Sequence, residues 1–204
     1  MTARTRIQTR LRNPHRNFNP KLRPAKDFVS LDPFMAESPT TSKIGSQFHI
    51  VLVEPEIPPN TGNIARLCAA TNSALHLIEP LGFELSDRTL KRAGMDYWQQ
   101  VHWCKWASWA AFVAQVSPQA RIWFVESNGP QRYSDVAFQA GDYLVFGRET
   151  AGLPESLYKN QPDRWLRLPM FNPDSRSLNL SNCVAAVLYE ALRQAGYPGE
   201  LPVD

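Results

Sequence analysis

The chain has 204 residues, of which 43% are hydrophobic, and its formal net charge is +3. This is enough for one domain with a sizeable core, or for one domain plus an arm, and no apolar run reaches the ~18 residues of a membrane-spanning helix, so we expect a soluble protein. The three cysteines lack CxxC spacing and the four histidines form no cluster. We therefore expect reduced thiols, a cytoplasmic location, and neither a disulfide framework nor a metal site.

The positive charge is concentrated at the amino terminus. Residues 1–34 hold eight Lys or Arg and two Asp, whereas residues 35–204 hold fourteen Lys or Arg and seventeen Asp or Glu. Because the basic segment is proline-rich and aperiodic, we expect residues 1–47 to be a disordered extension in front of a domain at 48–204. The extension could tether nucleic acid, target an organelle or be dispensable, and translation could start at Met1 or Met35.

Strands and helices alternate from Phe48 onward. The patterning predicts, in chain order, a strand at 48–53, a helix at 63–71, a strand at 75–80, a helix at 85–95, a possible strand at 101–106, a helix at 108–116, strands at 121–127 and 142–147, a short helix at 153–160, a strand at 164–170 and a last helix within 175–194. In that last helix, four apolar residues at helical spacing predict a buried face: Val184, Val187, Leu188 and Ala191. The alternation is typical of an α/β fold with a mostly parallel sheet flanked by helices.

Three predicted strand ends are followed by unusual loops. They read ESNGP from Glu126, GRETAGLP from Gly147, and PMFNPDSRSLN from Pro169. Around the entrance of the last helix, six polar residues crowd where one N-cap would suffice: Ser175, Arg176, Ser177, Asn179, Ser181 and Asn182. Because ligands bind outside the carboxyl ends of parallel strands, we expect these loops to converge on one ligand.

Common phosphate and nucleophile motifs are absent from the sequence. The first strand is followed by EPEIPPNTGN rather than GxGxxG, and the chain contains neither GxxxxGK[ST] nor GxSxG. The sequence therefore lacks the motifs that are typical of dehydrogenases, kinases and hydrolases. NTGNIAR places Asn60, Asn63 and Arg66 on one helical face, but helix capping by Asn60 or Thr61 together with a surface arginine would explain the same residues.

Four segments in order resemble the SPOUT class of RNA methyltransferases, and specifically the tRNA (cytidine/uridine-34) 2′-O-methyltransferase family. They are EPEIPPNTGNIARLC, HLIEPLGFELSDRTLKRAGMDYW, GDYLVFGRETAGLP and LPMFNPDSRSLNLSNCVAAVLYEA, and the resemblance spans about residues 48–198. It implies a SPOUT fold with a deep trefoil knot near the carboxyl terminus, an exception among folds. It also implies S-adenosylmethionine as cofactor, a homodimer with the site at the subunit interface, and as substrate the wobble ribose in the anticodon stem-loop of leucine tRNAs.

The resemblance carries specific site residues with it. It implies cofactor binding at Val125, Gly147, Leu168, Ser177 and Glu149, and catalytic roles for Arg66, Asn60, Asn179 and Tyr189, although Tyr189 could be a core tyrosine. Candidate RNA-binding residues are Arg148, Arg176 and the cationic helix face of Arg88, Lys91 and Arg92, for which a solvated surface is the alternative. Two features depart from the family pattern: Arg148 and Ala151 stand where Pro and Arg are expected, and NPDSRS is one residue longer than usual. Base stacking by Trp98, Trp103, Trp106 and Trp109 is less expected than core or dimer packing.

The expected chemistry needs no metal, because a sulfonium activates its methyl group. The ribose 2′-hydroxyl is a poor nucleophile, so the site must align it and stabilise the developing alkoxide. We expect Arg66 to supply that stabilisation or to hold the adjacent phosphate rather than act as a base, since a guanidinium is not deprotonated in proteins. Asn60 and Asn179 would orient the ribose or the loop backbone, and Ser177 would close the cofactor loop. Two alternatives remain open: a 2′-O-methyltransferase for rRNA or another tRNA position, and a non-catalytic RNA-binding factor with the same fold.

Overall fold

The computed structural model describes residues 47–85 and 100–203. The basic extension up to residue 46 lies outside the described residues. So does all but the first residue of the helix predicted at 85–95, together with Arg88, Lys91, Arg92 and Trp98.

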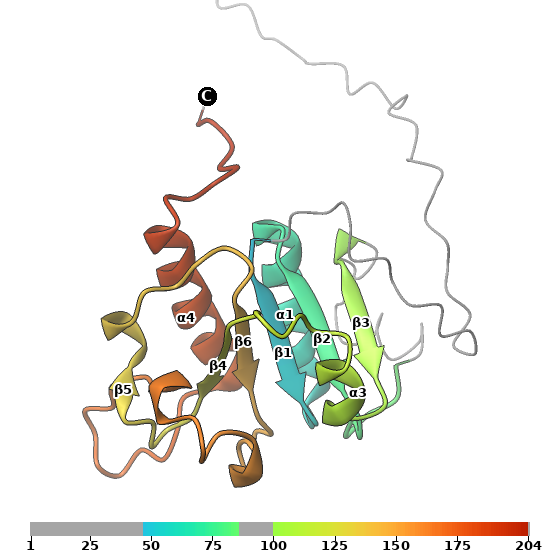
Figure 1. The fold of residues 1–204 in the computed structure, drawn as a ribbon, viewed down its shortest axis with the longest axis vertical. Coiled ribbons are helices and arrows are strands. Elements are labelled where there is room, and N and C mark those ends of the chain that lie inside the picture. The colour runs from blue at the N-terminus through green and yellow to red at the C-terminus, as the bar shows by residue number, and fades with distance from the viewer. Residues whose placement is uncertain (1–46, 86–99, 204) are drawn as a thin grey trace, which may run out of the picture. The chain divides into compact units, whose positions relative to one another are not determined.

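A parallel sheet forms the centre of the fold, as the alternation of elements predicts (Figure 1). Among the described residues it has seven strands in the order β3-β2-β1-β6-β4-β7-β5, and every pair of neighbours is parallel. The strands are β1 (His49–Val53), β2 (Ala74–Ile78), β3 (Trp103–Trp106), β4 (Ile122–Val125), β5 (Gln131–Arg132), β6 (Tyr143–Phe146) and β7 (Trp165–Arg167). Strand β5 is missing from the sequence-based prediction, because a two-residue strand has no measurable period.

The register of the central strands brings the ends of distant segments together. Phe146 of β6 is paired with Leu52 of β1 on one side and with Val125 of β4 on the other. Val125 is paired in turn with Leu166 of β7. The chain therefore leaves β1, β6, β4 and β7 at one edge of the sheet, where the three predicted loops begin.

Helices cover both faces of the sheet. They are α1 (Pro58–Thr71), α3 (Trp109–Val113) and α4 (Leu180–Gln194), with short 3-10 turns η2 (Tyr133–Asp135), η3 (Glu155–Leu157) and η4 (Pro162–Arg164). Helix α1 starts five residues before the predicted position, because prolines in its first turn have a helical φ and need no amide partner. Its N-cap is Ile57, so the alternative explanation of Asn60 or Thr61 as helix caps is wrong. The helix predicted at 153–160 is reduced to the single turn η3.

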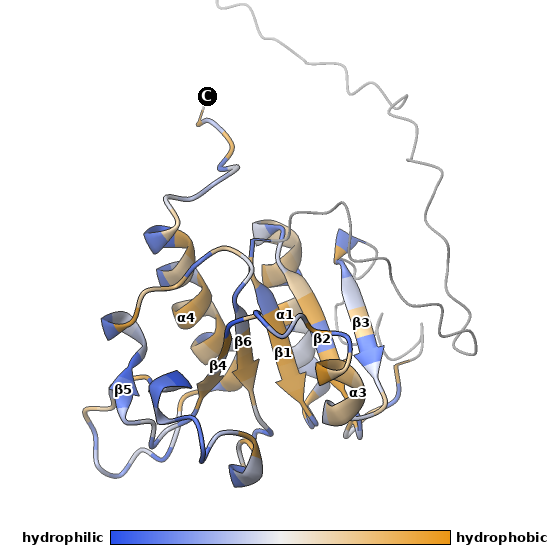
Figure 2. Cartoon of the chain, in the orientation of Figure 1, coloured by the Kyte–Doolittle hydropathy of each residue, from blue (hydrophilic) through white to orange (hydrophobic). Residues whose placement is uncertain are grey.

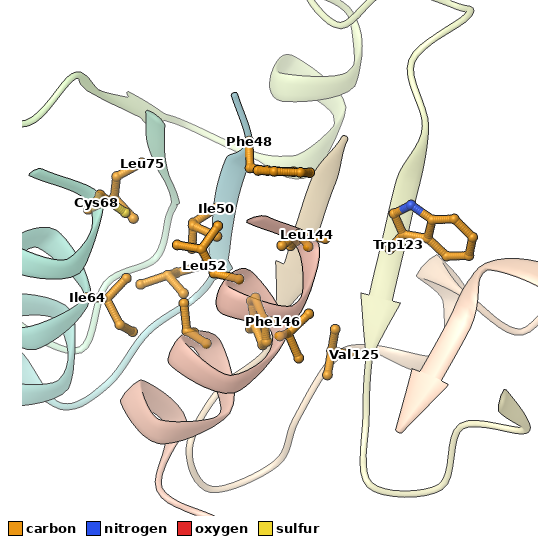
Figure 3. Close-up of a cluster of buried hydrophobic side chains, with 14 of the residues drawn as sticks. Phe48, Ile50, Leu52, Ile64, Cys68, Leu75, Trp123, Val125, Leu144 and Phe146 are labelled. Atoms are coloured by element: carbon orange, nitrogen blue, oxygen red, sulfur yellow. The ribbon is translucent and has the colours of Figure 1, made fainter. Parts of the chain in front are cut away.

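Alternation along the strands divides the core into two layers. Ile50 and Leu52 of β1 point to the layer that α1 and α4 cover, whereas Val51 and Val53 point to the layer that contains Phe112 of α3. Figure 2 shows the hydrophobic residues gathered on the central strands, and Figure 3 shows the first layer from close by. The predicted buried face of the last helix is confirmed: Val184, Val187, Leu188 and Ala191 are each 0% exposed.

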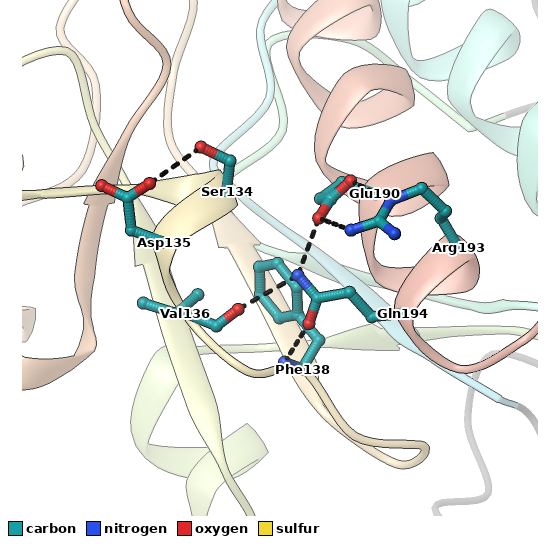
Figure 4. A network of polar contacts seen from close by, with 7 residues as sticks. All are labelled: Ser134, Asp135, Val136, Phe138, Glu190, Arg193 and Gln194. Carbon is teal, nitrogen blue, oxygen red and sulfur yellow. Dashed lines mark hydrogen bonds and ion pairs between the residues drawn. The ribbon is translucent and has the colours of Figure 1, made fainter.

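Polar contacts fix the carboxyl-terminal end of α4 to the loop after η2 (Figure 4). The Gln194 side chain donates from Nε2 to Val136 O at 3.0 Å and accepts from Phe138 N at 2.8 Å. Its Nε2 also donates to Glu190, which accepts two further bonds at 2.8 Å from Arg193. Helix α4 is thus held at its far end as well as along its apolar face.

A pair of histidines, His76 buried and His49 half-buried, lies in the second layer, away from the loop edge. Trp106 Nε1 donates to His76 Nδ1 at 3.2 Å, so His76 carries its proton on Nε2 and donates to His49 Nδ1 at 3.1 Å. Burial lowers the pKa of His49 to about 4, and burial together with the neighbouring His49 lowers the pKa of His76 to about 3. Both rings are therefore neutral at physiological pH, and they belong to the core.

Within the described ranges, no helix is both long enough and apolar enough to cross a bilayer. All three cysteines are free thiols, Cys68 being buried and Cys104 and Cys183 half-buried.

Candidate functional site

A pocket of about 510 Å³ opens at the carboxyl edge of the sheet. Its walls come from the loops after β4, β6 and β7 and from the beginnings of α1 and α4. The pocket brings together nine of the predicted site residues: Val125, Gly147, Leu168, Ser177, Glu149, Asn60, Asn179, Arg148 and Arg176. The expected convergence of the three loops is confirmed.

A chain of hydrogen bonds joins three of these walls. Asn179 Nδ2 donates to Asn60 Oδ1 at 2.9 Å, and Asn60 Nδ2 donates to Glu149 Oε1 at 2.9 Å. Glu149 also accepts from the backbone amides of Glu56 at 2.9 Å and Ile57 at 3.3 Å. We call Asn179, Asn60 and Glu149 the amide relay, because two side-chain amides link one carboxylate to a helix end.

The amide relay contacts the amino-terminal end of helix α1. Ile57 has no side chain that could accept from the first amides of the helix. The Glu149 carboxylate, 93 residues further along the chain than Glu56, accepts instead from the Glu56 and Ile57 amides just before the helix, and a negative charge is favourable at a helix amino terminus. Glu56 reciprocates by accepting from the Thr150 amide at 3.1 Å and from its hydroxyl at 2.7 Å. The loop after β6 and the start of α1 therefore hold each other.

Asn179 explains part of the polar cluster before the last helix. It is the N-cap of α4, and its Oδ1 accepts from Ser181 N at 2.9 Å, from Ser181 Oγ at 2.7 Å and from Asn182 N at 3.4 Å. One asparagine thus caps α4 through its oxygen and reaches Asn60 through its nitrogen. Arg176 and Ser177 remain exposed on the pocket wall, facing solvent rather than the core.

Glycines let the pocket loops approach one another closely. A Cβ added to Gly147 would lie 2.1 Å from the Gly152 carbonyl carbon and 2.2 Å from Leu153 N. Both neighbours are backbone atoms, which cannot move aside as a flexible side chain would. Gly152 itself has a φ of +66°, a left-handed conformation that favours glycine. The GRETAG stretch therefore needs both of its glycines.

Charges around the pocket are partly paired. Arg148 Nη1 lies 3.4 Å from Glu54 Oε2, and Glu149 is engaged in the amide relay. Glu126, directly after β4, also lines the pocket, and burial raises its pKa above the usual range against the effect of hydrogen bonds from Leu153 and Ser127. The sequence-based prediction missed Glu126, although a lone carboxylate at the end of a central strand was a usable signal.

Two predicted catalytic residues do not line the pocket. Arg66 lies on the exposed side of α1, and Tyr189 on α4 is 51% exposed, so the reading of Tyr189 as a core residue is wrong. Trp103, Trp106 and Trp109 are half-buried and pack against the two core layers, as expected. Across residues 47–85 and 100–203, no group of three or more His, Cys, Asp or Glu side chains is placed to hold a metal ion.

Known proteins share this architecture. The model of the SpoU rRNA Methylase family matches residues 47–189. A tRNA (cytidine(34)-2′-O)-methyltransferase from Burkholderia cenocepacia is 53% identical over 154 residues, which are 74% of this chain and 98% of the relative. A solved structure described as giving structural insights into the 2-OH methylation of C/U34 on tRNA has a TM-score of 0.69 and 45% identity, covering 74% of this chain and 97% of its own.

A more distant solved structure supports the fold alone. It is the SpoU methyltransferase AviRb from Streptomyces viridochromogenes in complex with the cofactor AdoMet, with a TM-score of 0.63 and 24% identity over 74% of this chain and 62% of that one. The family match spans most of the described residues, and the relative from Burkholderia is covered almost completely. The resemblance seen in four sequence segments is therefore confirmed, and the chain belongs to the SpoU rRNA methylase family and is a methyltransferase.

Proposed function

We propose that this chain transfers a methyl group from S-adenosylmethionine to the ribose 2′-hydroxyl of nucleotide 34, a cytidine or uridine derivative, in leucine tRNAs. The observation that carries the proposal is the pocket itself. Its loop after β6 is joined to the starts of α1 and α4 by the amide relay. The chain is also 53% identical to a tRNA (cytidine(34)-2′-O)-methyltransferase.

The residues of the pocket suit this cofactor. A volume of about 510 Å³ is in the range of small-molecule sites. Val125, Phe146, Leu168 and Met170 offer an apolar surface to an adenine ring, and the backbone of the loop after β6 offers hydrogen-bonding groups. When bound, S-adenosylmethionine would supply an activated methyl group, so the chain itself needs only to orient the nucleophile and stabilise charge.

The roles of the polar residues follow from their contacts. Asn60 and Asn179 use their side-chain amides to hold Glu149 and α4, so they act on the loop backbone more directly than on the ribose. Ser177 and Arg176, both exposed on the wall, are free to meet the cofactor and a phosphate of the RNA. Arg66 stabilises the alkoxide that develops on the ribose.

Arg66 is exposed and does not line the pocket of its own chain, so we propose that a second copy of the chain brings it to a pocket. Helices α1 and α4 pack side by side, and around them Ile57, Leu178 and Tyr189 are 41%, 44% and 51% exposed. A homodimer formed through this surface would bury these side chains and complete each pocket with an arginine from the other subunit. Light scattering should then give twice the mass of the chain.

The close approaches of the backbone support the knot that the family resemblance implies. A Cβ on Gly129 would lie 2.3 Å from the Leu166 carbonyl carbon, and Gly147 touches Gly152 in the same way. We infer that the chain after β6 passes through a loop of its own backbone, with the glycines where the strands of the crossing touch.

The test is methylation of purified RNA followed by mapping of the modified ribose. Total tRNA and rRNA are incubated with the protein and labelled S-adenosylmethionine, and the 2′-O-methyl group is located by mass spectrometry. We expect label at position 34 of leucine tRNAs. Label in rRNA or at another tRNA position would show that the proposed substrate is wrong. The absence of label with every RNA tested would overturn the proposed reaction.

Arginine variants separate catalysis from folding. We expect Arg66→Ala to lower the methylation rate roughly 100-fold or more, as removal of an oxyanion-stabilising group does, with cofactor affinity unchanged. Arg193→Ala is the matched control, since Arg193 is exposed at the end of α4 and pairs only with Glu190 among the ion pairs of the described residues. Equal activity of the two variants would contradict the role of Arg66.

A further inference from the structure

Glu126 lines the pocket and is held there by backbone contacts. It follows β4 directly, and its backbone amide donates to Leu166 O at 2.9 Å. Its Oε1 accepts from the amide of Leu153. A Cβ on Gly152 would lie 2.5 Å from Oε1 and 2.7 Å from Oε2, so the carboxyl group packs closely against the loop after β6.

This carboxylate has no cationic partner in the part of the chain that the structure describes. The ion pairs there include Arg148 with Glu54, but none involves Glu126. Its hydrogen bonds come from neutral backbone amides, and it is only half-exposed. A half-buried carboxylate without a counter-ion is less favourable than one beside a cation, so Glu126 would stabilise a cation bound in this pocket.

The proposed reaction changes the charge of the pocket's ligand by one unit. S-adenosylmethionine carries a sulfonium cation, whereas the demethylated product carries a neutral thioether in an otherwise identical molecule. We propose that Glu126 distinguishes the two, its negative charge favouring the methylated cofactor and releasing the demethylated product. This inference rests on the proposed function, because it requires that cofactor in this pocket.

The size of the effect follows from the dimensions of the pocket. A cube of 510 Å³ has an edge of about 8 Å, which sets the scale of the distance between the carboxylate and a bound cation. Coulomb's law for unit charges about 8 Å apart, with an effective dielectric constant of about 40, corresponds to a change in affinity on the order of 5-fold.

The experiment is calorimetric titration of S-adenosylmethionine and S-adenosylhomocysteine into the full chain and into Glu126→Gln. Glutamine keeps an oxygen for the Leu153 amide and removes the charge. We expect the variant to lose about 5-fold in affinity for the methylated ligand while the affinity for the demethylated one stays constant or rises. Glu155→Gln is the matched control, because Glu155 is an exposed carboxylate outside the pocket lining, and its ratio of affinities should equal that of the unmodified chain.

An equal loss for both ligands, or no loss for either, would overturn the proposal and leave Glu126 as a brace for the loop. If the unmodified chain bound neither ligand, both the proposed function and the role of Glu126 would fail. If the unmodified chain bound both ligands with equal affinity, only the role of Glu126 would fail.

A pH titration of the unmodified chain gives an independent answer even if the variant does not fold. The preference for the methylated ligand should rise as Glu126 ionises with increasing pH in the acidic range, and then level off. Groups near Glu126 include Cys183 of α4 and Tyr158 after η3. Burial raises the pKa values of both groups, so they stay neutral in the acidic range. Arg148, Arg176 and Glu149 line the same pocket, and their effects remain in Glu126→Gln. A preference independent of pH would contradict the proposal.

Discussion

The amide relay can be tested by one substitution that keeps the helix cap and removes a donor. In Asn179→Asp, an oxygen still accepts from Ser181 and Asn182, and aspartate is as good an N-cap as asparagine. The other oxygen replaces Nδ2 and faces Asn60 Oδ1, an acceptor 2.9 Å from the lost donor. Rotating the Asn60 amide would not help, because its oxygen would then face the Glu149 carboxylate.

The cost follows from one lost hydrogen bond and one buried acceptor without a partner. Asn60 is 5% exposed, and leaving a buried polar atom unpaired costs about 1–3 kcal/mol. Since Asn179 itself is exposed and water can reach it, we expect about 1–2 kcal/mol, or a decrease in Tm of roughly 2–8 °C for a chain of this size. Asn182→Asp is the matched control, because it adds the same charge in the first turn of α4 and should change stability by no more than about 0.5 kcal/mol.

A second substitution should reverse the direction of the relay. When Asn179→Asp is combined with Glu149→Gln, the side chain at position 149 gains an amide that can donate to Asn60 Oδ1. The Asn60 amide can then rotate, so that its Nδ2 donates to the new carboxylate at position 179. We expect the double variant to recover about 1 kcal/mol relative to the sum of the single variants, measured by urea unfolding in a double-mutant cycle.

Two results would refute the reasoning. One is an Asn179→Asp variant as stable as Asn182→Asp, which would mean that the relay does not stabilise the fold. The other is strict additivity of the two substitutions in the relay, which would mean that Asn60 does not couple them.

Two further predictions concern the loop glycines and the histidine pair. Gly147→Ala should abolish measurable cofactor binding in calorimetry, because its Cβ would lie 2.1 Å from a backbone atom. Gly141→Ala is the control: its Cβ would meet nothing within 4 Å, so this variant should bind the cofactor normally despite a backbone strain of about 1–2 kcal/mol at its φ of +89°. Equal cofactor binding by the two variants would contradict the packing argument. Burial lowers the pKa of His49 to about 4 and of His76 to about 3, so the folded chain binds fewer protons than the unfolded chain, and stability should fall as pH decreases from about 6.5 towards about 4. His49→Asn keeps an acceptor for His76 and should reduce this slope by up to ~1.4 kcal/mol per pH unit in urea unfolding; an unchanged slope would show that His49 is not the titrating group.

Local patterns in the sequence predict most of the fold correctly. The β-branched run at 48–53 and the apolar spacing of Val184, Val187 and Leu188 indicate both the elements and their buried faces, because periodicity depends only on neighbouring residues. The start of α1 could not be placed in the same way, because the prolines that suggest a turn also fit a first helical turn.

The sequence by itself determined which residues are chemically able to form the site: the glycines of GRETAG, the polar cluster before the last helix and the family motifs. Only the tertiary structure decided how they are connected. Asn60 meets Glu149 across 89 residues and Asn179 across 119, and no local pattern encodes a partner at that separation. The same holds for Arg66, whose motif position is evident but whose exposed place on α1 follows from how that helix packs against α4. Periodicity specifies which face of an element is buried, whereas the path of the backbone specifies what that face and its loops will touch.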